Sequence, residues 1–235
     1  MKILLLASIM SILTLNLSAQ KIIEKEFDIS ATGKIDIELK FADLIKITTW
    51  NSNKVAFKAS IDLNNGLYND SLKHEFIPAG NSGLTIKSSI NKKFNNWMSK
   101  KNYDPENENV KFWTGNESFI ISEIIYEIKV PEKCLLSINS INADIEIRDL
   151  KNTMEIKTIN GFVDLNWQES DAANFEMKTI NGEVYSDLEE LNLLNRKEHP
   201  MVGYNLKASL KSNPSITVKL ETINGNVYLR NAKGL

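Results

Sequence analysis

Hydrophobic and polar residues alternate along most of the chain, as they do in β-strands that bury one face. Apolar residues recur at every second position over residues 22–61, 84–90 and 119–130. These runs predict an all-β protein with an N-terminal β region over residues 20–130. The region is expected to end at Pro131, because proline cannot donate a hydrogen bond to a strand ladder.

A repeated phrase dominates the rest of the chain. Residues 156–161 read IKTING, residues 177–182 read MKTING, residues 220–225 read LETING, and residues 138–143 (INSINA) form a degenerate copy. The asparagines of the four copies, Asn142, Asn160, Asn181 and Asn224, are separated by 18, 21 and 43 residues. The last spacing is about twice the second, which predicts a diverged copy within residues 189–215. Recurrence at about 20 residues predicts a β-helix-like solenoid over residues 131–235.

The Asn-Gly pairs also permit a second architecture. Asn-Gly is the strongest short-range signal for a two-residue hairpin turn, because both residues tolerate a positive φ. Gly161, Gly182 and Gly225 each follow a repeat asparagine, whereas Ala143 occupies this position in the degenerate copy. An antiparallel hairpin meander or sandwich is therefore the alternative. The regular period favours parallel stacking, in which equivalent asparagines lie above one another and share side-chain hydrogen bonds.

Charged residues alternate with the apolar residues inside each copy and are expected to point outward. Glu155 and Lys157 recur as Glu176 and Lys178, so strict stacking in chain order brings like charges together. The last copy has the reverse order, Lys219 then Glu221, and this reversal relieves the repulsion.

Several phrases resemble the β-strand-repeat putative adhesin family, an exported bacterial domain of unknown function. They are KTINGFVDL at residues 157–165, KTINGEVYSDL at residues 178–188, VKLETINGNVYLRNAKG at residues 218–234 and LIKITTWNSNKVAFKASI at residues 44–61. With residues 126–147, the resemblance covers most of residues 27–234. It implies an exported all-β protein with a β-helix-like stack and no catalytic role.

The N-terminus has the pattern of a secretory signal peptide over residues 1–19. Lys2 precedes an apolar run over residues 3–17, and Ser18-Ala19 supplies the small residues expected before a cleavage site. The run is shorter than the roughly 20 residues that cross a bilayer, so we expect no membrane span in the mature chain. These features predict export to the periplasm or to the cell surface.

Composition and motifs restrict the possible chemistry. Without residues 1–19 the chain has 27 basic and 30 acidic residues, a formal charge of −3 that argues against a nucleic-acid partner. His74 and His199 have no Cys or second His at ligand spacing, and Cys134, the only cysteine, is interpreted as a buried structural thiol. The repeat asparagines are interpreted as turn residues, with a calcium or sugar site as the alternative. We therefore predict no catalytic residues, no metal site and no cofactor.

Aromatic residues within residues 91–117 provide the strongest functional candidate. This segment is polar and irregular, yet it contains Trp97, Tyr103, Phe112 and Trp113. Flat aromatic faces bind sugar rings or a partner protein at low entropic cost; the alternative is that they cover the flank of the stack. The sequence thus predicts a non-enzymatic, adhesin-like binding module of the cell envelope, with an envelope protein or a glycan as partner. A self-associating scaffold subunit is the second hypothesis, and a polysaccharide-processing enzyme is the third.

Overall fold

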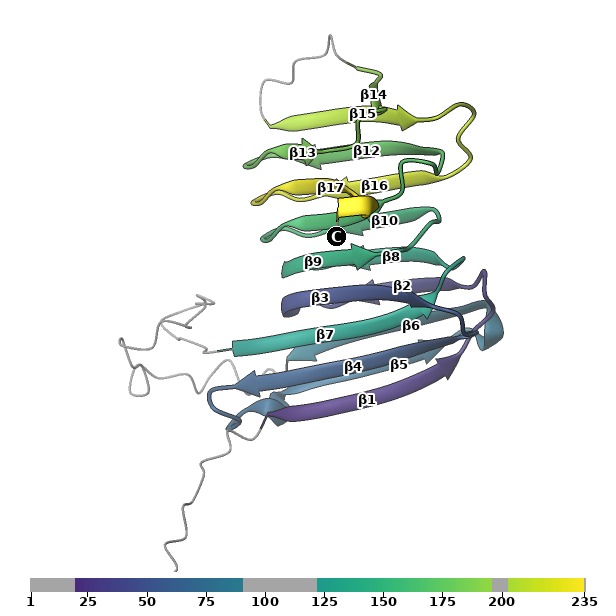
Figure 1. Ribbon diagram of the computed structural model, residues 1–235. Coiled ribbons are helices and arrows are strands. Elements are labelled where there is room, and N and C mark those ends of the chain that lie inside the picture. Colours follow the sequence, from purple (N-terminus) through teal and green to yellow (C-terminus); the bar gives the residue numbers. More distant parts are fainter. Residues whose placement is uncertain (1–19, 91–121, 196–202, 235) are drawn as a thin grey trace, which may run out of the picture.

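The computed structural model describes residues 20–90, 122–195 and 203–234, which form two mixed β-sheets facing each other (Figure 1). Sheet A has the strand order β1 (Lys21–Asp28), β4 (Lys54–Leu63), β7 (Ser122–Pro131), β3 (Phe41–Trp50), β9 (Asn142–Arg148), β11 (Val163–Trp167), β17 (Val227–Asn231), β13 (Val184–Ser186). Sheet B has the order β14 (Asn192–Leu193), β15 (Tyr204–Leu210), β12 (Ala173–Thr179), β16 (Thr217–Glu221), β10 (Met154–Lys157), β8 (Leu135–Asn139), β2 (Lys34–Glu38), β6 (Gly83–Ile90), β5 (Leu72–Pro78). Three short 3₁₀ turns, Asn69–Ser71, Gly80–Ser82 and Ala232–Gly234, complete the described part.

One hydrophobic core fills the space between the two sheets. Every second residue of most strands points inward, which is the alternation seen in the sequence. Trp167 and Tyr126 are the largest fully buried side chains, and the Trp167 ring meets that of Phe175 edge-on at 5.5 Å. Both sheets run through the predicted boundary at Pro131, so residues 20–130 and 131–235 share this core.

Each repeat copy crosses from sheet B to sheet A. The first copy forms β8 and β9, the second β10 and β11, the third β12 and β13, and the last copy β16 and β17. Equivalent strands of neighbouring copies pair in parallel, with Met154 opposite Leu136 and Val163 opposite Ile145. The Asn-Gly pairs therefore lie in turns between sheets, and the hairpin interpretation of these pairs is wrong.

The all-β prediction is confirmed, but the strands do not form the predicted β-helix-like solenoid. The two sheets stay open. Sheet B has antiparallel pairs at both ends, β5 with β6 and β12 with β15, whereas sheet A has them only at the end where β1 pairs with β4. The two facing layers agree with the predicted alternative, a sandwich. The repeat copies nevertheless stack in parallel.

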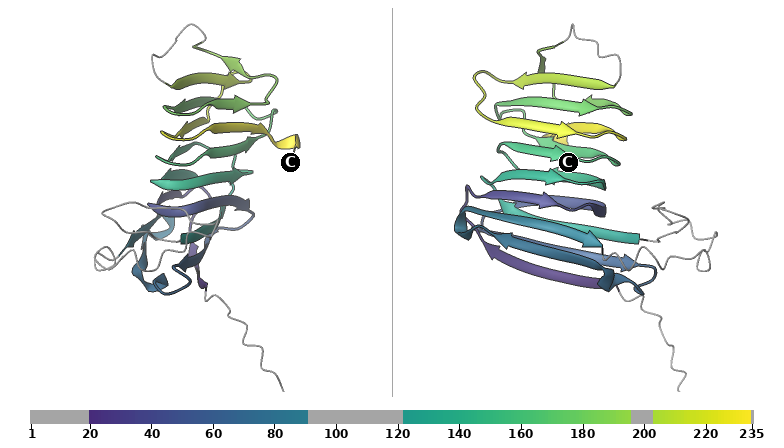
Figure 2. Two further views of the ribbon diagram at one scale, coloured as in Figure 1. Left: turned by 90° about the vertical axis from the view of Figure 1, so that its left-hand side faces the viewer. Right: turned by 180° about the vertical axis from the view of Figure 1, so that it is seen from behind.

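The copies do not stack in chain order. The last copy lies between the second and the third: β16 pairs with both β10 and β12, and β17 pairs with both β11 and β13. Figures 1 and 2 show these yellow strands between green ones from three sides. The prediction of a diverged copy within residues 189–215 is wrong for this reason. That segment contributes β14 and β15, an antiparallel pair at the end of sheet B.

The inserted position of the last copy brings opposite charges together. The outward residues of sheet B then face opposite charges on both neighbouring strands: Lys219 is opposite Glu155 and Glu176, and Glu221 is opposite Lys157 and Lys178. The Lys178–Glu221 ion pair measures 3.0 Å. Direct pairing of the second copy with the third would instead place Glu opposite Glu and Lys opposite Lys, which destabilises a sheet.

Candidate functional site

The repeat asparagines form a ladder along one edge of the stack. In spatial order they are Asn142, Asn160, Asn224 and Asn181. Three of them donate from Nδ2 to the Oδ1 of the preceding asparagine in this order: Asn160 to Asn142 at 2.6 Å, Asn224 to Asn160 at 2.7 Å and Asn181 to Asn224 at 2.7 Å. The amide groups are thereby bonded to one another along the stack.

The threonine and glycine of each repeat phrase are explained by close packing of neighbouring copies. Thr222 is buried, and its hydroxyl donates to the Gly161 carbonyl at 2.8 Å. A Cβ at Gly225 would lie 2.1 Å from that same oxygen, so no larger residue fits. Among the repeat glycines only Gly161 has a positive φ, and the repeat asparagines have none. No copy therefore has the positive φ at both residues that an Asn-Gly hairpin turn requires. Close approach of neighbouring copies explains the glycines instead.

Cys134 is buried in the core, and His74 is half-buried on β5. Burial raises the pKa of the Cys134 thiol to about 12, so the thiol stays protonated at neutral pH and is a poor nucleophile. His74 Nε2 lies 2.9 Å from the Tyr126 hydroxyl, and burial lowers the pKa of His74 to about 4. Cys134 thus belongs to the core, and His74 packs at the edge of the core against the rings of Phe57 and Tyr126.

Several sequence predictions fall outside the described residues. These are the signal peptide at residues 1–19, the binding residues Trp97, Tyr103, Phe112 and Trp113, and His199. Within the described ranges, no group of three or more His, Cys, Asp or Glu side chains is placed to hold a metal ion. The same ranges contain no helix long and apolar enough to cross a bilayer.

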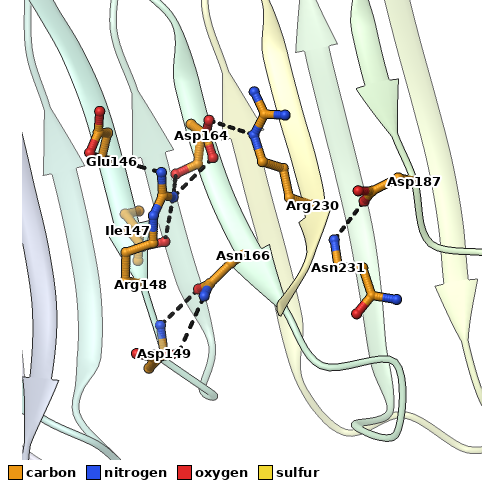
Figure 3. A network of polar contacts seen from close by, with 9 residues as sticks. All are labelled: Glu146, Ile147, Arg148, Asp149, Asp164, Asn166, Asp187, Arg230 and Asn231. Carbon is orange, nitrogen blue, oxygen red and sulfur yellow. Dashed lines mark hydrogen bonds and ion pairs between the residues drawn. The ribbon is translucent and has the colours of Figure 1, made fainter. Parts of the chain in front are cut away.

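A charged cluster lies on the outer face of sheet A, where the last copy meets the second (Figure 3). Asp164 accepts hydrogen bonds from Arg148 Nη1 at 2.9 Å and from Arg230 Nε at 2.7 Å. The two guanidinium groups leave only 10% of the Asp164 side chain exposed. Asn166 on the same strand bonds the backbone nitrogen of Asp149 at 2.8 Å and so holds the turn that leaves β9.

Two tyrosines extend this cluster to the edge of sheet A. The rings of Tyr185 and Tyr228 stack at 5.4 Å with an angle of 11° between their planes. The Arg230 guanidinium lies 4.7 Å from the centre of the Tyr228 ring. Asn226 Nδ2 donates to the Tyr228 hydroxyl at 2.9 Å, and Glu183 accepts from the Tyr185 hydroxyl, which raises the pKa of Tyr185.

We refer to Arg148, Asp164, Tyr185, Tyr228 and Arg230 as the tyrosine–arginine surface. Its rings and guanidinium groups are held by neighbours, while Tyr185 remains 46% exposed. Fixed aromatic and arginine side chains are the residue types that carry most binding energy at protein interfaces. Sequence reasoning missed this surface, because Tyr185 and Tyr228 meet only when the last copy inserts. Their outward position within each strand was nevertheless visible in the alternation.

Comparison with known proteins finds solved structures that resemble this fold, but no relatives by sequence. No family model matches the chain, and no curated protein matches it. A putative cell adhesion protein from Clostridium sporogenes aligns over 90% of this chain and 99% of its own, with 11% identity and a TM-score of 0.48. A putative adhesin from Bacteroides fragilis aligns over 90% and 97%, with 11% identity and a TM-score of 0.24. One from Parabacteroides merdae aligns over 71% and 64%, with 12% identity and a TM-score of 0.29. Likeness at this level establishes neither a shared family nor a shared function.

Proposed function

We propose that this protein is a non-enzymatic, exported binding module of the cell envelope, and that the tyrosine–arginine surface contacts its partner. The observation that supports this most strongly is the ordered pairing of Tyr185 with Tyr228 beside Arg230. Binding requires no further ordering of these side chains, so little conformational entropy is lost on association. Export rests on the signal-like residues 1–19.

The geometry around Asp164 supports a binding role rather than an acid–base role. A catalytic carboxylate must reach a substrate, whereas both oxygens of Asp164 are bonded to arginines and the side chain is nearly covered. The two arginines keep part of their surface open, with 24% of the Arg148 side chain and 43% of the Arg230 side chain exposed. They are placed to donate hydrogen bonds to carbonyl, hydroxyl or carboxylate oxygens of a partner.

The test is a binding titration of the chain from Gln20 onwards against a glycan array and against intact bacterial cells. Tyr185→Ala is expected to weaken binding about tenfold or more. Ile22→Ala is the matched control, because Ile22 is 47% exposed on β1 at the opposite edge of sheet A. A variant with Trp97→Ala and Trp113→Ala tests the aromatic segment predicted from sequence. Equal binding by Tyr185→Ala and the unsubstituted chain would contradict a contact at this surface.

A self-associating scaffold is the second candidate, supported by the edge of sheet A. In the described part of the chain β13 pairs only with β17, so its other edge is open to a further strand. The opposite edge argues against a continuous fibre, since β1 carries Glu24, Lys25 and Glu26 in succession and charged edge strands resist pairing. A mass that rises with protein concentration in sedimentation would support this candidate, and a constant monomer mass would exclude it.

A further inference from the structure

A polar groove lies on the outer face of sheet B, away from the tyrosine–arginine surface. It has a volume of about 280 Å³ and crosses β8, β2, β6 and β5. Its polar side chains come from neighbouring strands in register: Ser137 lies opposite Asp36, which lies opposite Thr85, and Asn139 lies opposite Glu38, which lies opposite Lys87. The groove therefore follows two rows of side chains across the sheet.

The groove exists because the first copy departs from the charge pattern of the others. Ser137 and Asn139 occupy the outward positions of β8, where the second copy has Glu155 and Lys157. Serine and asparagine are shorter than glutamate and lysine, so the surface is lower here. The charged side chains of β10 stand on one side of the groove, and Ile77 of β5 lines it on the other, 43% exposed.

The lining has unused hydrogen-bonding capacity and little net charge. Among the described residues, the side chains of Thr85, Ser137 and Asn139 make no hydrogen bond. By contrast, the two carboxylates are paired with lysines: Asp36 with Lys34 at 2.9 Å and Glu38 with Lys87 at 3.0 Å. Three neutral groups that donate and accept hydrogen bonds, set between neutralised ion pairs, favour an uncharged ligand with many hydroxyl groups.

We propose that this groove binds a neutral saccharide of one or two rings. The hydroxyl and amide groups of Ser137, Thr85 and Asn139 bond the sugar hydroxyls, and Ile77 packs against the apolar C–H face of a ring. The volume of about 280 Å³ lies just below the usual range for small-molecule sites, roughly 300–1,000 Å³, which limits the ligand to a small unit. This site is independent of the tyrosine–arginine surface and of the partner proposed for it.

The test is calorimetric titration of the full chain with maltose, cellobiose, lactose and N,N′-diacetylchitobiose, with digalacturonic acid as an acidic comparison. About 20 mM sugar nearly saturates a site with a Kd of about 1 mM. Amide chemical shifts in an NMR titration then locate the bound sugar. We expect at least one neutral disaccharide to bind and to shift amides of β8, β2 and β6.

Three variants separate a true groove site from a general surface effect. Ser137→Lys fills the groove, and the fold should tolerate it because the new lysine lies between Glu155 and Asp36. Both Ser137→Lys and Asn139→Ala are expected to weaken binding at least about tenfold, as loss of groups in direct contact with a ligand does. Asn205→Ala, on the same sheet but outside the groove, is expected to leave sugar binding unchanged.

Four results would overturn the proposal. They are no binding of any neutral disaccharide, shifts confined to amides outside the groove, unchanged affinity in a folded Ser137→Lys variant, and binding of digalacturonic acid alone. None of them bears on the tyrosine–arginine surface, because that surface lies on sheet A and the groove lies on sheet B.

Discussion

Reversing the two charges of β16 tests why the last copy lies where it does. The variant exchanges Lys219 for Glu and Glu221 for Lys, and leaves the apolar residues Val218 and Leu220 in the core. In the native sheet each of the two side chains faces an opposite charge on β10 and another on β12. Reversal therefore converts four favourable cross-strand pairs into four repulsive ones.

The magnitude follows from the exposure of these pairs. In the Lys178–Glu221 pair the side chains are 49% and 33% exposed, so solvent screens the interaction. An exposed pair contributes about 0.3 kcal/mol and a like-charge pair costs a similar amount, so four conversions destabilise the fold by about 2 kcal/mol. For a domain of this size that corresponds to a thermal midpoint lower by roughly 4–8 °C.

Thermal unfolding followed by circular dichroism at low and high salt is the assay. The loss should shrink in about 1 M salt, where the Debye length falls to about 3 Å. Reversing Glu155, Lys157, Glu176 and Lys178 as well, together with Lys207 opposite Glu176 on β15, restores every opposite-charge pair and should recover the original midpoint. An unchanged midpoint in the first variant, or no recovery in the second, would refute the role of charge in ordering the copies.

Three further predictions concern single residues. Burial lowers the pKa of His74 from its ordinary value of 6.5 to about 4 in the folded chain. The contribution of His74 to the free energy of unfolding is therefore fully present above pH 6.5, and it falls by at most about 3 kcal/mol as the pH drops from 6.5 to 4. Urea unfolding of His74→Gln should lack this part of the pH dependence. Gly161→Ala should cost more than about 2 kcal/mol because its Cβ would lie 2.1 Å from the Ala143 carbonyl oxygen. Its matched control is Gly80→Ala, which has a positive φ but open space around the Cβ and should cost only about 1 kcal/mol in the same urea titration. Asn224→Ala removes two ladder hydrogen bonds and should cost about 1 kcal/mol, and no loss would show that the ladder contributes nothing to stability.

Local pattern was enough to predict the strands of the repeats and their faces. Residues such as Met154 and Ile156 alternate with charged neighbours, and the structure buries the former and leaves the latter at the surface. The parallel contact between copies also followed from the repeated phrase. These features depend on residues that are close together in the chain, so a single sequence is enough to predict them.

The order of the copies depends on interactions between distant residues and was missed. Asn181 and Asn224 are 43 residues apart yet adjacent in the ladder. The reversed charges of Lys219 and Glu221 were the one signal for this arrangement, since they match the second and third copies only when placed between them. Counting periods along the chain gave the wrong order because it assumed that each copy follows its predecessor in space.

Neither of the two candidate binding regions on described residues was predicted from the sequence, and the two reasons are related. The tyrosine–arginine surface joins Tyr185 to Tyr228 across two strands that are distant in the chain. The groove arises from Ser137 and Asn139, whose effect becomes visible only beside the longer side chains of neighbouring strands. A departure from the charge pattern within a repeat is thus a signal for a surface groove that the sequence does contain.

The measurement that tests the central claim most directly is disulfide trapping of neighbouring strands. Residues opposite each other on adjacent strands lie about 5 Å apart, whereas residues two strands apart lie about 10 Å apart, beyond the reach of a disulfide. If the last copy lies between the second and the third, Glu155→Cys with Lys219→Cys should cross-link on mild oxidation, and Glu155→Cys with Glu176→Cys should not. The native Cys134 is buried and does not compete. Efficient cross-linking of the 155–176 pair, with none for the 155–219 pair, would contradict the inserted copy and the tyrosine–arginine surface built on it.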